Sequence, residues 1–544
     1  MGFLRSAFTT SLALTSHAVA LDPIVMKGSK FFTKSGDQFF IKGVAYQQEA
    51  GGGPGGSSTS KNTYVDPLSN EDTCKRDIPL LEKLGVNTIR TYAIDPKADH
   101  SACMSMLDKA GIYVVADLGE PALSINRDSP AWNVELFDRY KGVVDNLGKY
   151  ENVIGFFAGN EVTNNNTNTD ASAYVKAATR DVKKYISDKQ KNGGRWMGVG
   201  YAANDDAEIR ANMAQYFNCG EQEDAIDFWG YNIYSWCGKS SFTQSGYDVQ
   251  VKFFSNFSVP VFFAEYGCNS PGGAEGRLWD DTTALYSSQM TDVFSGGIVY
   301  MFHEEENDYG LVKVNGNSAN PMKNYKVLQS KLADVKPSST SMAAYNPTNS
   351  PAACPAVSDD WKVAVGLPPT PDSALCDCMV SSSSCVPADD LAEKDYGDIF
   401  GYICKNDAAA CAGIKADTET GVYGPYGMCN PKDQLAHVLN AYYQNQNSAS
   451  TACDFNGAAK VVSAKADSSC EASLAKANSA VAVAATATAG SAVTSSTSTG
   501  DSKSSENAAA PASVRMAPFL AMGDMAVGLY MLVAMGVGAG MVML

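Results

Sequence analysis

The sequence predicts an α/β protein: a (β/α)8 TIM barrel followed by a small disulfide-rich module. Between residues 38 and 332, eight short apolar runs alternate with longer amphipathic segments, as expected of parallel strands with both faces covered. Eight cysteines then fall between residues 374 and 472. A doubly wound open sheet is the alternative fold, but no glycine-rich nucleotide fingerprint follows the first run.

The eight predicted strands are bounded by turn residues and rich in β-branched and aromatic side chains. In chain order they are 38–46, 85–92, 111–119, 153–162, 196–204, 225–234, 260–268 and 296–304. Helix-length segments separate them, and the clearest predicted helix spans residues 170–191. The glycine-rich stretch 51–60 is predicted to be a flexible loop, because no Lys-Ser/Thr pair follows it to hold a phosphate.

Both ends of the chain have the pattern of processing signals. Residues 1–20 combine a basic residue, an apolar stretch and a small-residue ending, which predicts a secretory signal peptide; a buried strand is the alternative. The apolar end of the chain predicts a glycosylphosphatidylinositol signal over 508–544, with Asn507 as the acceptor. A single membrane-spanning helix is the alternative. The expected location is the outer face of the plasma membrane, or the cell wall.

The regions between these signals differ in composition. The predicted order is a catalytic barrel over 21–335, a proline- and serine-rich linker over 336–373, a cysteine-rich module over 374–472 and a Ser/Ala/Thr-rich stalk over 473–507. The chain carries 59 acidic and 42 basic residues, a net charge of −17, which argues against a nucleic-acid partner.

The cysteine count fits the secretory route. Fourteen cysteines, an even number, predict seven disulfides in an oxidising compartment, although the spacing alone does not decide the connectivity. With only four histidines and no matching Cys-x-x-Cys pairs, no metal site is expected. Two sequons predict N-glycosylation at Asn165 and Asn256.

Two glutamates end predicted strands. The fourth strand ends in Asn160-Glu161, and the seventh contains Glu265. Catalytic groups of such barrels lie at the carboxyl ends of the strands. Retaining glycoside hydrolysis needs two carboxyl groups roughly 5 Å apart, one to protonate the leaving oxygen and one to attack the anomeric carbon. This chemistry needs no cofactor, and the strand context indicates Glu161 and Glu265 as the pair.

Other acidic residues are candidates for the same role. Asn70-Glu71 is the same dipeptide as Asn160-Glu161, but it lies in a polar segment and carries no catalytic implication. Asp117 and Glu120 follow the third strand, and Asp117 is predicted to contact substrate; the acidic run 304–306 is predicted to be a solvated loop. Aromatic residues at strand ends favour a carbohydrate cleft. They are Tyr92, Tyr234, Trp236 and Tyr300.

Six motifs in order resemble a known family. They are RTYAID, FFAGNEV, GYAANDDAEIR, WGYNIYSWCG, FFAEYGC and GGIVYMFHEEENDYGLV. Together they resemble fungal glycoside hydrolase family 72, the β-1,3-glucanosyltransferases of the cell wall. The resemblance extends from about residue 21 through the cysteine-rich module, whose cysteine spacing is similar to carbohydrate-binding module family 43.

The resemblance implies a retaining transglycosylase that cleaves an internal β-1,3-glucan bond and passes the non-reducing part to another glucan chain. It implies that Glu161 is the acid/base, Glu265 the nucleophile and Asn160 a hydrogen-bond partner of the sugar 2-hydroxyl. Other residues implied to line the subsites are Tyr92, Asp205, Arg210, Tyr234, Tyr300 and the loop from Gly119 to Arg127. Because the acid must start protonated, an acidic pH optimum is expected.

The alternatives are an anchored endo-β-1,3-glucanase with the same two glutamates and a catalytically inactive glucan-binding protein of the wall. One departure from the family pattern is Met301-Phe302, where some relatives have an acidic residue between two tyrosines. The departure puts product length or acceptor preference in question more than the chemistry.

The resemblance also implies the disulfide pairing. The implied pairs are Cys74 with Cys103, Cys219 with Cys354, Cys237 with Cys268, Cys376 with Cys429, Cys378 with Cys470, Cys385 with Cys453, and Cys404 with Cys411.

Overall fold

The computed structural model describes residues 21–48, 64–465 and 467–487. The predicted signal peptide, the predicted acceptor Asn507 and the predicted 508–544 signal lie outside the described residues, as does the whole glycine-rich loop 51–60. In the part of the chain that is described, no helix is both long enough and apolar enough to cross a membrane.

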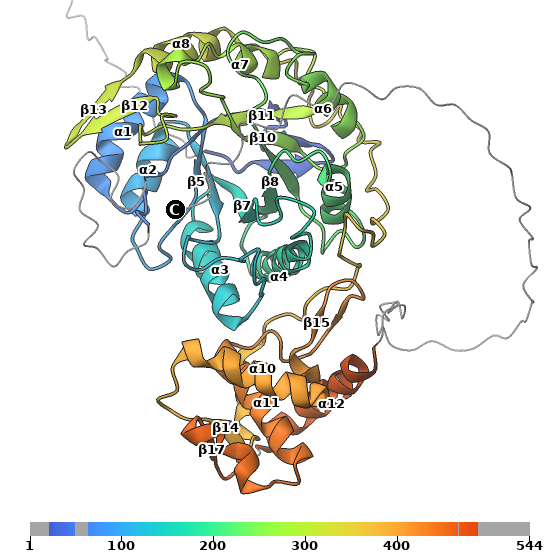
Figure 1. Cartoon of the computed structure of the whole chain (residues 1–544). Coiled ribbons are helices and arrows are strands. Elements are labelled where there is room, and N and C mark those ends of the chain that lie inside the picture. The colour runs from blue at the N-terminus through green and yellow to red at the C-terminus, as the bar shows by residue number, and fades with distance from the viewer. Residues whose placement is uncertain (1–20, 49–63, 466, 488–544) are drawn as a thin grey trace, which may run out of the picture. The chain divides into compact units, whose positions relative to one another are not determined.

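A closed barrel of eight parallel strands forms the centre of the catalytic region (Figure 1). Its strands are β4 (Ile41–Ala45), β5 (Thr88–Thr91), β6 (Tyr113–Asp117), β7 (Val153–Asn160), β8 (Gly198–Ala203), β9 (Phe228–Ile233), β10 (Val261–Tyr266) and β11 (Phe294–Val299). Neighbours in the chain are neighbours in the barrel, and β11 closes it on β4. The predicted fold is confirmed. Seven of the predicted strands contain one barrel strand each, and the eighth, 296–304, overlaps β11, which begins two residues earlier.

One helix follows each strand, so that the helices surround the barrel (Figure 1). They are α1 (Glu71–Leu84), α2 (Ser101–Lys109), α3 (Val134–Leu147), α4 (Ala171–Lys191), α5 (Arg210–Asn218), α6 (Tyr247–Phe254), α7 (Asp280–Leu285) and α8 (Lys323–Asp334). A hairpin of β12 (Val312–Asn315) and β13 (Ser318–Pro321) precedes α8. Helix α4 begins one residue after the predicted start, and the alanines of its buried face leave room for close packing on the barrel.

A small antiparallel sheet precedes the barrel and was not predicted as a separate element. It consists of β1 (Val25–Lys27), β2 (Lys30–Phe32) and β3 (Gln38–Phe39), the last of which forms the start of the first predicted strand. The ring of Phe31 packs 6.1 Å from the rings of Phe228 and Phe262, both inside the barrel. The sheet therefore contributes side chains to the inner core.

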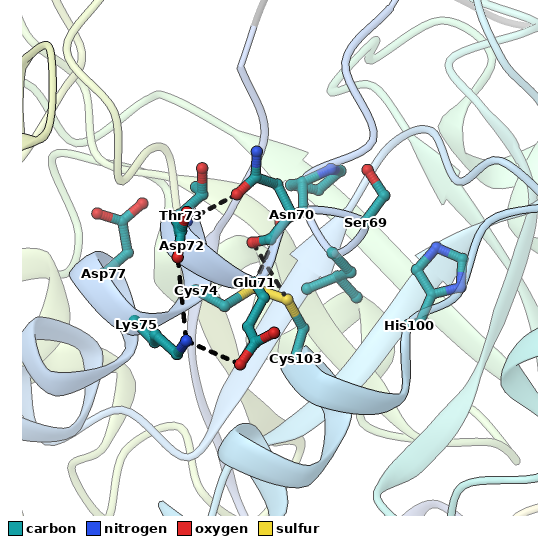
Figure 2. Close-up of a disulfide and its surroundings, with 12 residues drawn as sticks. Ser69, Asn70, Glu71, Asp72, Thr73, Cys74, Lys75, Asp77, His100 and Cys103 are labelled. Atoms are coloured by element: carbon teal, nitrogen blue, oxygen red, sulfur yellow. Dashed lines mark hydrogen bonds and ion pairs between the residues drawn. A yellow bond between two sulfur atoms is a disulfide. The ribbon is translucent and has the colours of Figure 1, made fainter.

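Asn70 of the Asn70-Glu71 pair has a structural role. Asn70 caps the start of α1: its side-chain oxygen accepts a hydrogen bond from the backbone N–H of Thr73 at 3.0 Å. Figure 2 shows this cap beside the disulfide between Cys74 on α1 and Cys103 on α2. Two further disulfides, Cys219–Cys354 and Cys237–Cys268, involve the barrel region.

The segment 336–373, predicted as a linker, lies against the barrel. Cys354 bonds to Cys219 at the end of α5. Trp361 is fully buried, with its ring 5.3 Å from that of Tyr216 on α5. The composition predicted a linker, and the Cys219–Cys354 disulfide that the resemblance implied, together with the buried indole of Trp361, holds this segment against the barrel.

The cysteine-rich module has two small hydrophobic cores, one of which is built around α11. Its elements are α9 (Ser373–Ser381), β14 (Cys385–Pro387), α10 (Tyr396–Asn406), β15 (Ala416–Asp417), β16 (Val422–Tyr423), α11 (Pro431–Asn445), β17 (Ala459–Val461) and α12 (Glu471–Thr486). Four disulfides link them, and all seven pairs of the chain are those that the resemblance implied. Helix α12 occupies the start of the predicted stalk, because its many alanines favour a helix.

Candidate active site

The end of β7 presents Glu161 on an unusual backbone. Glu161 has φ +48°, a left-handed backbone conformation. This conformation is energetically unfavourable for residues other than glycine, and residues that adopt it cluster at functional sites. Two hydrogen bonds hold it there: its N–H donates to the carbonyl of Ala202 at 2.8 Å, and Arg127 Nη2 donates to its carbonyl at 2.6 Å. Asn232 Nδ2 donates to the carboxyl oxygen Oε1 at 2.8 Å. The backbone conformation and the hydrogen bond from Asn232 together fix the orientation of the half-buried carboxyl group.

Glu265 lies on β10 in a far more enclosed setting, with only 8% of its surface exposed. Its Oε1 accepts hydrogen bonds from the Tyr92 hydroxyl at 2.8 Å and from Arg90 Nη1 at 3.3 Å, and its Oε2 accepts one from the Tyr234 hydroxyl at 2.8 Å. Burial raises the pKa of Glu265, and the nearby charge of Glu161 adds to the rise. Arg90 and the two hydroxyls act against it by stabilising the ionised form.

A chain of polar contacts joins the two carboxyl groups. Arg90 reaches Glu265 and also donates from Nη2 to Asn160 Oδ1 at 2.9 Å. Asn232, the register partner of Glu265 on β9, donates to the same oxygen at 3.1 Å and to Glu161. Because Asn160 Oδ1 accepts both bonds, its amide nitrogen is the end that can donate to a sugar hydroxyl.

Arg90 is fully buried and forms a bidentate pair with Asp117, at 3.0 Å from Nε to Oδ1 and 2.9 Å from Nη2 to Oδ2. Burial lowers the pKa of Arg90, but Asp117, Tyr92 and Glu265 more than offset this, so its pKa is raised and it stays charged. Asp117, predicted to contact substrate, thus holds the arginine that contacts Glu265.

Four tyrosines surround the Glu265 side of the site. Tyr300, which follows β11, packs edge-on against Tyr92 and Tyr234 at 6.4 Å and against Tyr309 at 5.4 Å between ring centroids. Tyr92, Tyr300 and Tyr309 are each partly exposed, as sugar-contacting rings must be. Burial raises the pKa of Tyr92 and Tyr234 well above its usual value, so both hydroxyls remain donors to Glu265.

The other predicted site residues lie at the same end of the barrel in different contacts. Asp205, after β8, pairs with Arg210 and accepts a hydrogen bond from the Tyr231 hydroxyl. These contacts do not join Asp205 or Arg210 to either glutamate. In the loop from Gly119 to Arg127, the last residue contacts Glu161, and the Gly119 carbonyl accepts a hydrogen bond from Arg139.

Three residues discussed from the sequence, Trp236, Met301 and Phe302, are buried in the protein core. Trp236 is buried with its ring 5.2 Å from that of Tyr247, so its indole belongs to the packing behind the cleft. Met301 and Phe302, the departure from the family pattern, are both buried in the cores. These two side chains therefore face packing partners more than an open cleft.

Sequence reasoning missed Arg90, Asn232 and Tyr309. A signal for the first two exists: a charged or amide side chain inside an otherwise apolar barrel strand needs a buried partner. Tyr309 lies in the sixth motif, but it follows an acidic loop with no periodic pattern, so nothing in the sequence distinguished it from its neighbours. Within the described residues, no group of three or more His, Cys, Asp or Glu side chains is placed to hold a metal ion.

A (β/α)8 barrel with two carboxyl groups at the ends of its fourth and seventh strands, flanked by partly exposed tyrosines, defines an enzyme that acts on glycosidic bonds. The model of the glycoside hydrolase family 72, described as glucanosyltransferase, matches residues 13–336, and that of the X8 domain matches residues 383–460. The chain belongs to this glucanosyltransferase family.

Similar proteins agree with this assignment. A 1,3-beta-glucanosyltransferase of Arthroderma benhamiae is 50% identical over 564 residues, covering 100% of both chains. The 1,3-beta-glucanosyltransferase gas1 of Schizosaccharomyces pombe is 45% identical and covers 84% of this chain and 82% of its own. The structure of a Glu-to-Gln mutant of Saccharomyces cerevisiae Gas2p with laminaritetraose and laminaripentaose has a TM-score of 0.74 and 38% identity, covering 84% of this chain and 99% of that one.

Proposed function

We propose that the enzyme elongates β-1,3-glucan by a retaining double displacement. It cleaves an internal β-1,3 bond of a donor chain, keeps the non-reducing part on Glu265 and transfers it to the non-reducing end of an acceptor chain. The polar chain that joins Glu265 to Glu161 through Arg90, Asn160 and Asn232 is the observation that carries this proposal. The names of the similar proteins, and the laminaritetraose and laminaripentaose in the Gas2p complex, support β-1,3-glucan as the substrate.

In the first step, a Glu265 carboxylate oxygen attacks the anomeric carbon while the glycosidic bond breaks. Glu161 gives its proton to the departing oxygen, and the reducing-end fragment leaves with a new hydroxyl group. The Asn160 amide donates to the sugar 2-hydroxyl, a bond that strengthens as the ring gains oxocarbenium character. Arg90, Tyr92 and Tyr234 fix the attacking oxygens in place.

In the second step, Glu161 is the base. It takes the proton of an acceptor sugar hydroxyl, whose oxygen attacks the anomeric carbon and displaces Glu265 as a carboxylate. Both glutamates return to their starting protonation states, and the two-step reaction needs no further reactant. Transfer dominates over hydrolysis when the acceptor glucan occupies the site in place of water.

The product lengths from one oligosaccharide test this proposal against an endo-β-1,3-glucanase. We expect incubation with a laminari-oligosaccharide of defined length to give products both longer and shorter than the donor. Mass spectrometry of the mixture over time checks this result. Shorter products alone would mean that water is the acceptor and would overturn the transferase assignment in favour of the hydrolase.

Two isosteric variants test the remaining alternative, a glucan-binding protein without catalysis. Glu161→Gln and Glu265→Gln should fold like the wild type, as judged by circular dichroism and melting temperature, and lose transfer. General acid–base catalysis alone is worth about 10²- to 10⁴-fold. Glu71→Gln is a matched control, because Glu71 lies at the exposed start of α1. Full transfer by either active-site variant would contradict the assigned roles.

The proposed location is the outer face of the plasma membrane, through a glycosylphosphatidylinositol anchor on Asn507. The small residues 507–509 and the uncharged, apolar composition of 526–544 support this. Phosphatidylinositol-specific phospholipase C should release the protein from membranes, and Asn507→Gln should prevent attachment. N-glycosylation is proposed at Asn165 and Asn256, and peptide-N-glycosidase treatment of variants at each position checks it.

A further inference from the structure

Arg277 is a buried arginine that the mechanism does not use. It follows the short helix η1 (Ala274–Gly276), and only 5% of its surface is exposed. All five N–H groups of the guanidinium are needed to match its partners. They donate from Nε to the carbonyl of Ala274 at 3.3 Å, from Nη1 to those of Tyr300 at 2.7 Å and Gly267 at 3.4 Å, and from Nη2 to those of Gly310 at 3.1 Å and Tyr309.

This placement of a charge is costly. Burial lowers the pKa of Arg277 to about 10, and the carboxylates of Asp281 and Glu304 act against this only through longer-range attraction. The guanidinium remains charged at neutral pH and also lies over the ring of Trp279, 4.3 Å from its centroid. Taking a charge out of water carries a desolvation penalty. What the buried guanidinium provides in return is that it holds five backbone carbonyls in place.

The carbonyls that Arg277 binds come from segments beside the nucleophile. Gly267 lies two residues after Glu265, and Tyr300 directly follows β11. Tyr309 comes from the loop before β12, and its ring packs 5.7 Å from that of Tyr234, which donates to Glu265. One guanidinium thus fixes the backbone of two partly exposed tyrosines at once.

We propose that Arg277 is a positioning residue for the glucan-binding wall formed by Tyr234, Tyr300 and Tyr309. Its side chain is too buried to touch the sugar, so it acts on the substrate only through the two tyrosines whose carbonyls it binds. The inference rests on the proposed function, because it assumes that glucan is the ligand of this wall. Loss of the guanidinium should weaken glucan binding more than it slows the chemical step.

Arg277→Lys tests this, because lysine keeps the charge but cannot donate in five directions. We expect the KM for a laminari-oligosaccharide to rise about tenfold while kcat stays within about twofold, equal to about 1.4 kcal/mol of binding. Arg195→Lys is the matched control: Arg195 is also largely buried and donates to the carbonyls of Tyr150, Val153 and Trp196, near the opposite end of β7. The control should lose similar stability with no change in KM.

A double-mutant cycle with Tyr309→Ala separates positioning from a general structural role. If Arg277 acts through the tyrosine rings, Arg277→Lys should raise KM clearly less in the Tyr309→Ala background than in the wild type. Full additivity, an equal KM rise in the Arg195→Lys control, or a loss confined to kcat would each overturn the proposal. If Arg277→Lys does not fold, Trp279→Phe is the second variant, because it loosens the stacking on Arg277. Trp279→Phe should also raise KM, and an unchanged KM would overturn the proposal.

Failure of the positioning role of Arg277 can be distinguished from failure of the proposed transferase function. If the wild type only shortens the oligosaccharide, the transferase assignment fails, but KM is still measured from the hydrolysis rate. If the wild type elongates and Arg277→Lys leaves KM unchanged, only the positioning role fails.

Discussion

The ends of β7 and β10 carry the same side chain in opposite surroundings. Glu161 is half-buried, rests on a left-handed backbone and receives one amide hydrogen bond from Asn232. Glu265 is buried within β10 and receives three hydrogen bonds, two from tyrosine hydroxyls and one from a charged arginine. The difference lies in the number of donors and in access to solvent.

This difference matches the two proposed roles. A nucleophile must be ionised and held still, and three donors do both for Glu265. An acid/base must exchange its proton with two different oxygens in turn, and a partly exposed carboxyl group with one neutral donor allows that. Each surrounding is suited to one role, so the two glutamates should not be interchangeable.

An activated donor should give the largest difference between the two sites. With a glucan oligosaccharide that carries a dinitrophenyl leaving group, the departing oxygen needs no proton, so Glu161→Gln should release dinitrophenol in a rapid burst. Glu265→Gln should release none, because no covalent intermediate can form. Stopped-flow absorbance measures the burst. The reverse pattern would exchange the assigned roles.

The next largest effect should come from Arg90, which contacts the Glu265 side directly and the Glu161 side only through Asn160. Lysine cannot reproduce its fork to Asp117 or reach Glu265 and Asn160 at once. We expect Arg90→Lys to lower kcat/KM about 10²-fold, equal to about 2.7 kcal/mol of transition-state stabilisation. Steady-state kinetics on a laminari-oligosaccharide measure the loss. Activity within a factor of three of the wild type would show that the polar chain is not needed.

The fold could be predicted because its signals are local and repeated. Eight apolar runs separated by amphipathic segments leave few alternatives to a closed parallel barrel. The small sheet before the barrel was missed because its strands have only two or three residues each. Helix α12 was predicted as stalk because alanine-rich composition does not by itself distinguish an unstructured segment from a helix with a few buried alanines.

The two glutamates could be proposed from strand position, but their surroundings could not. Whether a carboxyl group is open or enclosed depends on side chains from other strands, such as Arg90 on β5 and Asn232 on β9. The contacts of Arg277 join four separate segments through backbone carbonyls, which no side-chain pattern in the sequence records. Long-range contacts of this kind become visible only in the folded chain.

A smaller effect is expected on the Glu161 side. Asn232→Ala removes the one amide donor to Glu161 and one of the two donors to Asn160. A hydrogen bond of this kind is worth about 1–1.5 kcal/mol, so kcat should fall about tenfold. Asn146→Ala is the matched control, because that amide donates to the carbonyls of Pro96 and Ala98 and its oxygen contacts His100, away from both glutamates. It should lower the melting temperature without lowering kcat.

The smallest change in rate, with the clearest change in pH dependence, should come from Tyr234→Phe. Glu265 must be ionised to attack, and its pKa is raised by burial, so activity should fall as the pH falls through that raised value. The Tyr234 hydroxyl stabilises the ionised form; without it the pKa rises further, and the acidic limb of the kcat/KM profile should move to higher pH. At the optimum we expect a loss of only about threefold, because Tyr92 and Arg90 still donate to Oε1.

Tyr325→Phe is the control for this prediction. The hydroxyl of Tyr325 on α8 donates to the carbonyl of Leu80 on α1, so its removal should leave the acidic limb in place. An acidic limb that does not move in Tyr234→Phe would show that another group sets it, and Glu265 would then no longer differ from Glu161 in the way its surroundings indicate.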